Sequence, residues 1–186
     1  MNTLQTFDLG QALRQYVTTY TEEQEFLKQF RDLLDSHPET CYFRTLPHAH
    51  LTGSAWIVNH HRDSVLLLHH RKLDKWLQPG GHADGERNIR QVARKEAEEE
   101  TGATGLDLLC GGKIFDLDIH RIPARKDEQA HFHFDVRFIF TADHTAPLQQ
   151  NSESKDLAWI RLEQAAEKCD HNRSILRMVE KTLAMN

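Results

Sequence analysis

Several features that would mark a special class of protein are scarce in this sequence. It has 3 cysteines and 5 prolines among 186 residues. The cysteines (Cys41, Cys110 and Cys169) are odd in number, widely separated and without metal-ligand spacing. They therefore argue against a disulfide framework and a cysteine-based metal site, and they favour reduced thiols in a cytoplasmic protein.

Long apolar runs and an excess of positive charge are also lacking. No apolar stretch approaches membrane-spanning length, and the N-terminus does not have the charged-then-apolar pattern of a signal peptide. The formal net charge of −5 argues against nonspecific nucleic-acid binding driven by overall charge. Hydrophobic content of 39% is ordinary for a soluble protein, and the length suits one domain with a full core.

The most informative stretch runs from Gly80 to Gly102, GGHADGERNIRQVARKEAEEETG. Apolar residues recur in it at helical spacing and stop at Gly102, which predicts an amphipathic helix. On that helix Glu96, Glu99 and Glu100 share one sector, because successive residues turn by about 100°. Three carboxylates on one sector repel each other unless a cation lies among them.

A solvated acidic face is the alternative interpretation of this run. Arg94 and Glu98, like Lys95 and Glu99, have the i,i+4 spacing of surface ion pairs. The glycine pair directly before the helix favours a cation-binding site instead, because its spacing folds the loop back over the helix.

The stretch resembles the Nudix box, G-x5-E-x7-R-E-U-x-E-E-x-G-U, where U is a bulky aliphatic residue. Aligned on the closing glycine, the box covers Gly81–Ala103 and its glutamate positions match Glu96, Glu99 and Glu100. The sequence departs from the pattern elsewhere, and we expect these departures to alter the loop more than metal binding. They are Lys95 at the arginine position, the small residues Ala97 and Ala103 at aliphatic positions, and Arg87 at the early glutamate position, with Glu86 one residue short.

The resemblance extends over roughly residues 42–165. Four segments are similar in order and spacing to one branch of the Nudix hydrolases: HLTGSAWIV, LLLHHRKLDKWLQPGGHADG, HFHFDVRFIF and ESKDLAWIRL. The resemblance implies an α/β/α sandwich around a mixed sheet. It also implies hydrolysis of a diphosphate bond in a nucleoside diphosphate linked to another moiety, by water that Mg²⁺ or Mn²⁺ activates.

Hydrophobic periodicity predicts helices at both ends of the chain. Residues 8–20 and a second helix opened by a capping box at Thr21 should form an N-terminal helical pair within residues 1–40. We expect this pair to pack on a main domain of residues 41–186, and it could also support a homodimer. The remaining helices are expected over residues 162–169 and 172–185, and strands over 51–58, 65–69, 131–141 and 157–160, with one or two more in 106–119.

The strand over 131–141 alternates between two faces. Its phenylalanines and Val136 are predicted to face the core, Phe132 included. The other face carries His131, His133 and Arg137, and we expect Arg137 to point into the substrate cleft.

The resemblance also assigns roles residue by residue. It makes Glu96, Glu99 and Glu100 metal ligands, with Gly81 offering its carbonyl oxygen. The base that deprotonates the attacking water is left open among Glu96, Glu99, Glu128 and Glu153, with Glu153 preferred of the two outside the box. The candidates for substrate binding are His82, Arg71, Lys72 and Arg137.

Two other functions compete with this interpretation. Lys95 and the shifted Glu86 motivate a non-catalytic Nudix-fold module that senses a nucleotide. The other alternative rests on the segment His131-Phe132-His133-Phe134-Asp135, which matches part of the His-x-His-x-Asp motif of metallo-β-lactamase-type zinc hydrolases. Two histidines at i,i+2 on a strand can share a metal. Val136 stands where that motif has its last histidine, which argues against it.

Overall fold

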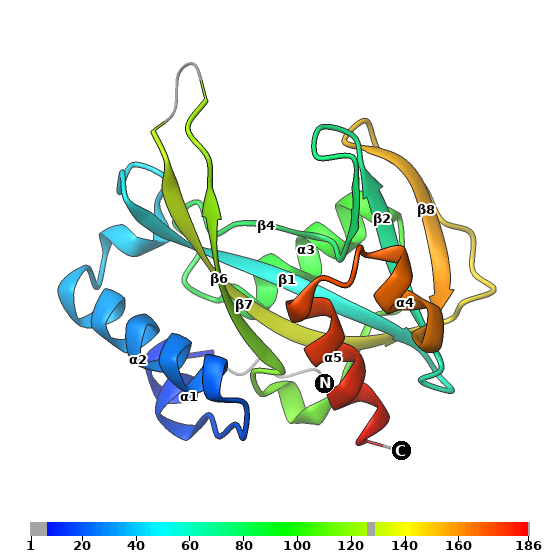
Figure 1. Cartoon of the computed structure of the whole chain (residues 1–186), viewed down its shortest axis with the longest axis horizontal. Coiled ribbons are helices and arrows are strands. Elements are labelled where there is room, and N and C mark those ends of the chain that lie inside the picture. Colours follow the sequence, from blue (N-terminus) through cyan, green and yellow to red (C-terminus); the bar gives the residue numbers. More distant parts are fainter. Residues whose placement is uncertain (1–6, 126–128, 186) are drawn as a thin grey trace.

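A computed structural model describes residues 7–125 and 129–185 of the chain. Its strands lie between helices at the two ends of the described chain, and α3 separates the first four strands from the rest (Figure 1). In chain order they are α1 (Leu9–Gln15), α2 (Thr21–Ser36), η1 (Thr40–Tyr42), β1 (Ala49–Asn59), β2 (Ser64–His70), β3 (Lys75–Leu77), β4 (Gly80–His82), α3 (Ile89–Thr101), β5 (Asp107–Leu108), η2 (Cys110–Gly112), β6 (Asp116–Ile122), β7 (His131–Ala142), β8 (Ser154–Arg161), α4 (Leu162–Lys168) and α5 (Arg173–Leu183).

The strands form one mixed sheet built around a long parallel pair. β1 and β7 run parallel in register from Ala49 opposite Phe132 to Asn59 opposite Ala142. The strand order is β3-β2-β1-β7-β5, while β4 pairs with β1, β6 with β7 and β8 with β2, all antiparallel. This sheet confirms the predicted mixed α/β class.

Helices cover both faces of the sheet, and each face has its own core. On one face α1, α2 and α3 pack on Leu51, Ile57, Phe138 and other residues of β1, β2 and β7. On the other face α4 and α5 cover a cluster that includes Trp56. The Trp56 indole Nε1–H donates a hydrogen bond to Thr182 Oγ1 at 2.9 Å, which fixes α5 to the sheet. The result is the expected α/β/α sandwich.

Close approach of α3 to the sheet depends on Gly53 of β1. A Cβ atom there would lie 2.7 Å from the Ile89 carbonyl oxygen and 3.1 Å from the Ala93 nitrogen. The glycine therefore lets the acidic helix lie directly over the central strand.

Some local predictions were wrong. α1 ends at Gln15 rather than near residue 20, because Tyr16 takes an extended conformation. Thr21 is the first helical residue of α2 and not its cap; Tyr20 is the N-cap and makes no side-chain capping bond. Phe132 is 44% exposed instead of buried, since it lies near the open start of β7.

No helix within the described residues is both long and apolar enough to cross a membrane.

Candidate active site

The three aligned glutamates of the acidic helix α3 differ in how far they are buried. Glu100 is buried at 7% exposure, Glu96 is half-buried and Glu99 is exposed. The helix begins after Asn88, whose side chain accepts the Gln91 N–H, and it ends at Gly102 with φ 68°. Both ends therefore follow the expected capping chemistry, which fixes the direction of the glutamates.

The glycine loop lies against these glutamates. The Gly80 N–H donates to Glu100 Oε2 at 2.9 Å. A Cβ at Gly81 would lie only 2.5 Å from Glu96 Cδ, so the loop backbone touches that carboxylate. β4 holds the loop in place by pairing Gly81 with Gly53 of β1. The predicted fold-back of the loop over the helix is confirmed.

The electrostatics of this group fit a bound cation. The pKa of Glu100 is raised to about 7, mainly by burial and also by Glu96, Glu153 and Glu99, against the opposing Gly80 hydrogen bond. Burial also raises the pKa of Glu96, with Glu99 and Glu153 contributing, and Lys95 only partly opposes this. These carboxylates raise one another's pKa because no positive charge among the described residues fully compensates their negative charges. A divalent cation would supply that charge, and carboxylate oxygens are donors that suit Mg²⁺ or Mn²⁺.

The residues that depart from the expected box pattern contact residues close to them in the structure. Lys95 Nζ lies 3.6 Å from Glu99 Oε1, the i,i+4 ion pair that the spacing predicts, and both side chains are largely exposed. Glu86 braces the loop, because its Oε1 accepts the Asn88 N–H at 2.8 Å. Arg87 pairs with Glu39 of the segment after α2.

Glu153 lies in the loop before β8, on the side of the acidic group. Its carboxylate acts electrostatically on both Glu96 and Glu100. Arg71 holds this loop: its Nε donates to the Ser152 carbonyl at 3.0 Å and its Nη2 to the Ser154 carbonyl at 2.8 Å. The Arg71 N–H also donates to the Glu153 carbonyl at 2.8 Å. The guanidinium predicted to contact substrate is therefore used to fix the Glu153 loop. The other outside candidate, Glu128, lies outside the described residues.

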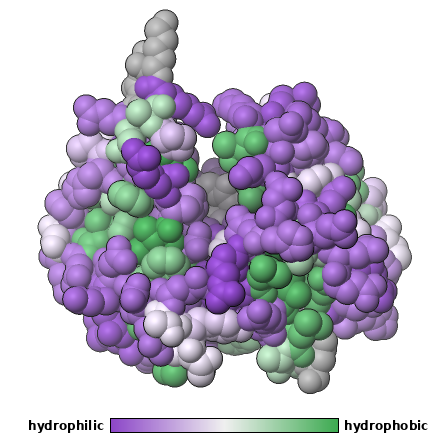
Figure 2. Space-filling view, viewed as in Figure 1, coloured by the Kyte–Doolittle hydropathy of each residue, from purple (hydrophilic) through white to green (hydrophobic). Residues whose placement is uncertain are grey.

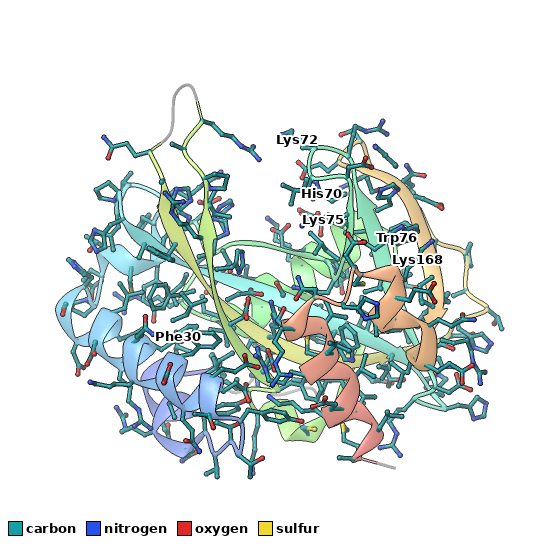
Figure 3. The ribbon with its side chains drawn as sticks, in the orientation of Figure 1. Phe30, His70, Lys72, Lys75, Trp76 and Lys168 are labelled. Atoms are coloured by element: carbon teal, nitrogen blue, oxygen red, sulfur yellow. The ribbon has the colours of Figure 1, made fainter. Side chains whose placement is uncertain are left out.

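The basic turn after β2 borders a hollow. Figure 2 shows that this face is mostly hydrophilic and is hollowed between the β6–β7 side and the β2–β8 side. Lys72 lies on the β2–β3 turn, with Lys75 below it, on the side of that hollow (Figure 3). Below the turn, Trp76 stacks on His69 at 5.2 Å, and Lys168 Nζ lies 4.3 Å from the Trp76 ring centre. Lys72 is thus exposed where an anionic group could approach.

Arg137 is not in an open cleft, which corrects the prediction from β7 alternation. It is 3% exposed, and its guanidinium pairs with Asp135 at 2.8 Å and with Asp116 and Asp118 at 3.1 Å. Burial raises the pKa of Asp118, but Arg137, His120 and Arg177 together outweigh this and hold the pKa below its ordinary value. Arg177 of α5 binds Asp116 as well, at 2.7 Å. The second face of β7 is polar but covered, and its charges join the sheet to α5.

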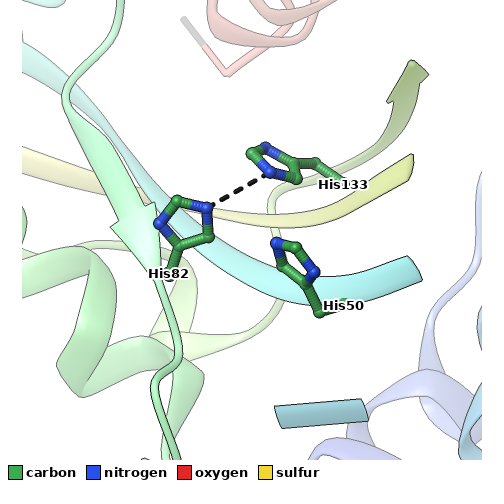
Figure 4. Close-up of side chains that lie close together, drawn as sticks. All are labelled: His50, His82 and His133. Carbon is green, nitrogen blue, oxygen red and sulfur yellow. Dashed lines mark hydrogen bonds between the residues drawn. The ribbon is translucent and has the colours of Figure 1, made fainter. Parts of the chain in front are cut away.

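The fourth predicted binding residue, His82, belongs to a group of histidines beside the glycine loop. His50, His82 and His133 each place a ring nitrogen within 4.8 Å of the others (Figure 4). His82 Nε2 and His133 Nε2 are 3.2 Å apart, as are His131 Nε2 and His133 Nε2. The pKa of His133 is lowered to about 2, mainly by burial and also by the surrounding histidines, so this ring is neutral. Among the described residues, His50, His82 and His133 bring their possible ligand atoms this close together, whereas the three glutamates of α3 do not.

Two cavities of the described structure lie away from the α3 glutamates. One of about 850 Å³ lies between α1 and η2, and its walls include Phe7, Tyr16, Arg90 and Ile114. A second, of about 180 Å³, is lined by Arg44, Thr45, Leu46, Pro47, His50, Gln129 and His131. The second cavity opens onto the histidines.

Solved structures share this architecture. The Caenorhabditis elegans Ap4A hydrolase in a binary complex is 20% identical with a TM-score of 0.57, over 73% of this chain and 98% of that one. The MutT protein from Methanosarcina mazei Go1 is 18% identical with a TM-score of 0.55, over 76% and 97%. The Escherichia coli dihydroneopterin triphosphate pyrophosphohydrolase is 16% identical with a TM-score of 0.55, over 73% and 96%. Identities this low establish the fold. No curated protein matches the sequence.

The mixed sheet and the glutamate helix behind its glycine loop define the class as a Nudix-type pyrophosphohydrolase. The NUDIX domain model matches residues 49–179, more than half of the chain, and the protein therefore belongs to that family.

Proposed function

We propose that this protein hydrolyses the diphosphate bond of a nucleoside diphosphate linked to another moiety, and that it requires Mg²⁺ or Mn²⁺. The observation that carries the proposal is the contact between the glycine loop and the glutamates. The Gly80 N–H donates to Glu100 and the Gly81 backbone touches Glu96, so the loop backbone contacts two of the three carboxylates. Ap4A and dihydroneopterin triphosphate, the compounds named for two of the similar structures, both contain phosphoanhydride bonds of the kind proposed here.

The residues proposed to hold the metal are Glu96, Glu99 and Glu100, with the Gly81 carbonyl. Their oxygens are the donors that Mg²⁺ prefers, and the raised pKa values of Glu96 and Glu100 support the need for a cation. When bound, the metal would neutralise phosphoryl oxygens and lower the pKa of a water molecule.

Glu153 is the proposed base. It is exposed on the side of the acidic group, and a carboxylate in such a position can act as general base toward water. Arg71 holds its loop through two carbonyl oxygens, and this keeps the carboxylate beside Glu96 and Glu100. Glu96 and Glu99 are the alternatives within the box.

Lys72 is proposed to bind substrate phosphate at the rim of the hollow. It is exposed on the β2–β3 turn, where a positive charge offsets the net charge of −5 for an anionic ligand. His82 is half-buried among other histidines, and we assign it a different ligand below.

The proposal is tested by Mg²⁺-dependent phosphate release from ADP-ribose, dinucleoside polyphosphates, nucleotide sugars and nucleoside triphosphates. Turnover of at least one compound, abolished by chelation and restored by Mg²⁺ or Mn²⁺, is expected. If no compound turns over while one raises the melting temperature, the protein is a nucleotide sensor instead.

We further propose a cytoplasmic setting, which the free state of the three cysteines supports. The division into an N-terminal extension and a main domain, and a homodimer through the N-terminal helices, remain predictions.

A further inference from the structure

The histidines beside the glycine loop come from separate strands that the sheet register aligns. His50 of β1 is paired with His133 of β7, and His133 is paired in turn with His120 of β6. His82 joins them from β4, where it is paired with Thr52 of β1. A group assembled from four strands is positioned by the fold and not by one flexible loop.

The spacing of the ring nitrogens matches that of ligands around a metal ion. Zinc–nitrogen bonds of about 2.0–2.1 Å in a tetrahedral arrangement put neighbouring ligand nitrogens about 3.3 Å apart. The His82–His133 and His131–His133 Nε2 distances are both 3.2 Å. The nitrogens of His50, His82 and His133 all lie within 4.8 Å of one another.

In their neutral forms these rings carry too few protons for hydrogen bonds alone to explain both Nε2 spacings. His131 Nδ1 lies 2.9 Å from the Gln129 carbonyl oxygen, which can only accept, so Nδ1 carries the proton. A neutral His131 therefore presents a lone pair at Nε2. His133 Nε2 has at most one proton, yet it has two Nε2 neighbours at 3.2 Å. A cation between the lone pairs would satisfy both contacts.

We propose that His50, His82 and His133, with His131 beside them, bind one divalent transition metal ion of the zinc type. Imidazole nitrogen favours Zn²⁺ and Co²⁺ over Mg²⁺, so this site differs in chemistry from the glutamate site on α3. The cavity of about 180 Å³ that reaches His50 and His131 gives an ion a way in.

The position of the site suggests what the ion does. His82 directly follows Gly81, whose backbone touches Glu96. An ion shared by His82, His50 and His133 would tie the three-residue strand β4 to β1 and β7. It would thereby hold the glycine loop against the acidic helix. The inference does not depend on hydrolysis, because the site can be tested with the metal alone.

Titration of untagged, chelator-stripped protein with Co²⁺ tests the site directly. We expect one Co²⁺ per chain, visible absorption bands of four-coordinate cobalt, and displacement by Zn²⁺ but not by Mg²⁺. At a hundredfold excess over its Kd, Zn²⁺ should raise the melting temperature by about 5 °C or more. Absence of the bands, or displacement by Mg²⁺, would overturn the proposal.

Variants locate the ion. His82→Gln and His133→Gln should each weaken Co²⁺ binding at least about tenfold. His61→Gln, a change in the exposed β1–β2 turn, and Glu99→Gln on α3 should bind Co²⁺ as the wild type does. Unchanged binding in His82→Gln, or lost binding in Glu99→Gln, contradicts the assignment.

X-ray absorption of the zinc-loaded wild type removes any dependence on variant folding. Multiple scattering from at least three imidazoles is expected. An oxygen-only ligand shell would show that the ion lies among carboxylates and would overturn the histidine site.

Discussion

The backbone of Gly81 lies directly against the carboxylate of Glu96. A Cβ atom at Gly81 would lie 2.5 Å from Glu96 Cδ and 2.6 Å from its Oε2. This contact joins the glycine loop to the acidic helix, two parts of the box that are 15 positions apart in the sequence. It explains why a glycine is needed there and gives the first prediction.

Gly81→Ala should displace the Glu96 carboxylate and lower kcat about a hundredfold, because small misplacements of catalytic groups have effects of that size. Gly10→Ala is the matched control, since a Cβ in α1 meets its nearest atom at an ordinary 3.4 Å. Steady-state kinetics with Mg²⁺ and thermal melting of both variants measure this. Wild-type activity in Gly81→Ala would show that the contact is not required.

Glu153→Gln should lower kcat by at least about a hundredfold, as expected for loss of a general base. Arg71→Ala should lower kcat by about tenfold, because Arg71 holds the loop that carries Glu153. In the double variant the effects should not add, since both act through one carboxylate. A negligible effect of Glu153→Gln would exclude it and leave the box glutamates and Glu128.

Protonation of Glu100 should couple metal binding to pH. Its folded-state pKa of about 7 lies above the ordinary value of 4.5, so its stability contribution is full below pH 4.5 and is lost as pH rises through 7. Metal-free protein should therefore be weakened at pH 8, and Mg²⁺ should raise its melting temperature more at pH 8 than at pH 6.

Glu100→Gln is the control for this effect. It removes the buried charge and should stabilise the metal-free protein at pH 8 by about 3 kcal/mol. It should also abolish the pH dependence of the Mg²⁺-induced shift. Denaturant unfolding at pH 6 and pH 8 measures both quantities, and a shift independent of pH in the wild type would rule out this role for Glu100.

Arg137→Met should destabilise the fold by about 3–5 kcal/mol, because it removes a buried guanidinium that pairs with Asp116, Asp118 and Asp135. Lys72→Met, on the exposed β2–β3 turn, should instead raise KM and leave stability within about 0.5 kcal/mol. Urea unfolding together with KM separates the two roles. An Arg137→Met variant of normal stability and raised KM would return Arg137 to the substrate site.

The parts of the fold that follow from local chemistry could be predicted from the sequence. The helix α3 was predicted from its apolar spacing and its closing glycine, and Gly102 indeed has the positive φ of a helix C-cap. The long strands β1 and β7 were predicted from their composition and alternation, within two residues at each end.

The features that depend on tertiary neighbours could not be predicted. Alternation along β7 separates two faces but does not show that α5 covers the second one, and so the burial of Arg137 was missed. The histidine group was missed because it depends on strand register, which pairs His50 with His133 across 83 positions of sequence. The one signal available was the His-x-His spacing of His131 and His133.

The most direct measurement of the central claim is the rate of Mg²⁺-dependent diphosphate hydrolysis by Glu99→Gln beside the wild type. Glu99 is exposed on α3, so the variant should fold and melt as the wild type does. We predict that the wild type turns over a nucleoside diphosphate derivative only with Mg²⁺ or Mn²⁺ and that Glu99→Gln abolishes this turnover. Wild-type rates in Glu99→Gln, with the fold intact, would contradict the assignment of the α3 glutamates as the metal site.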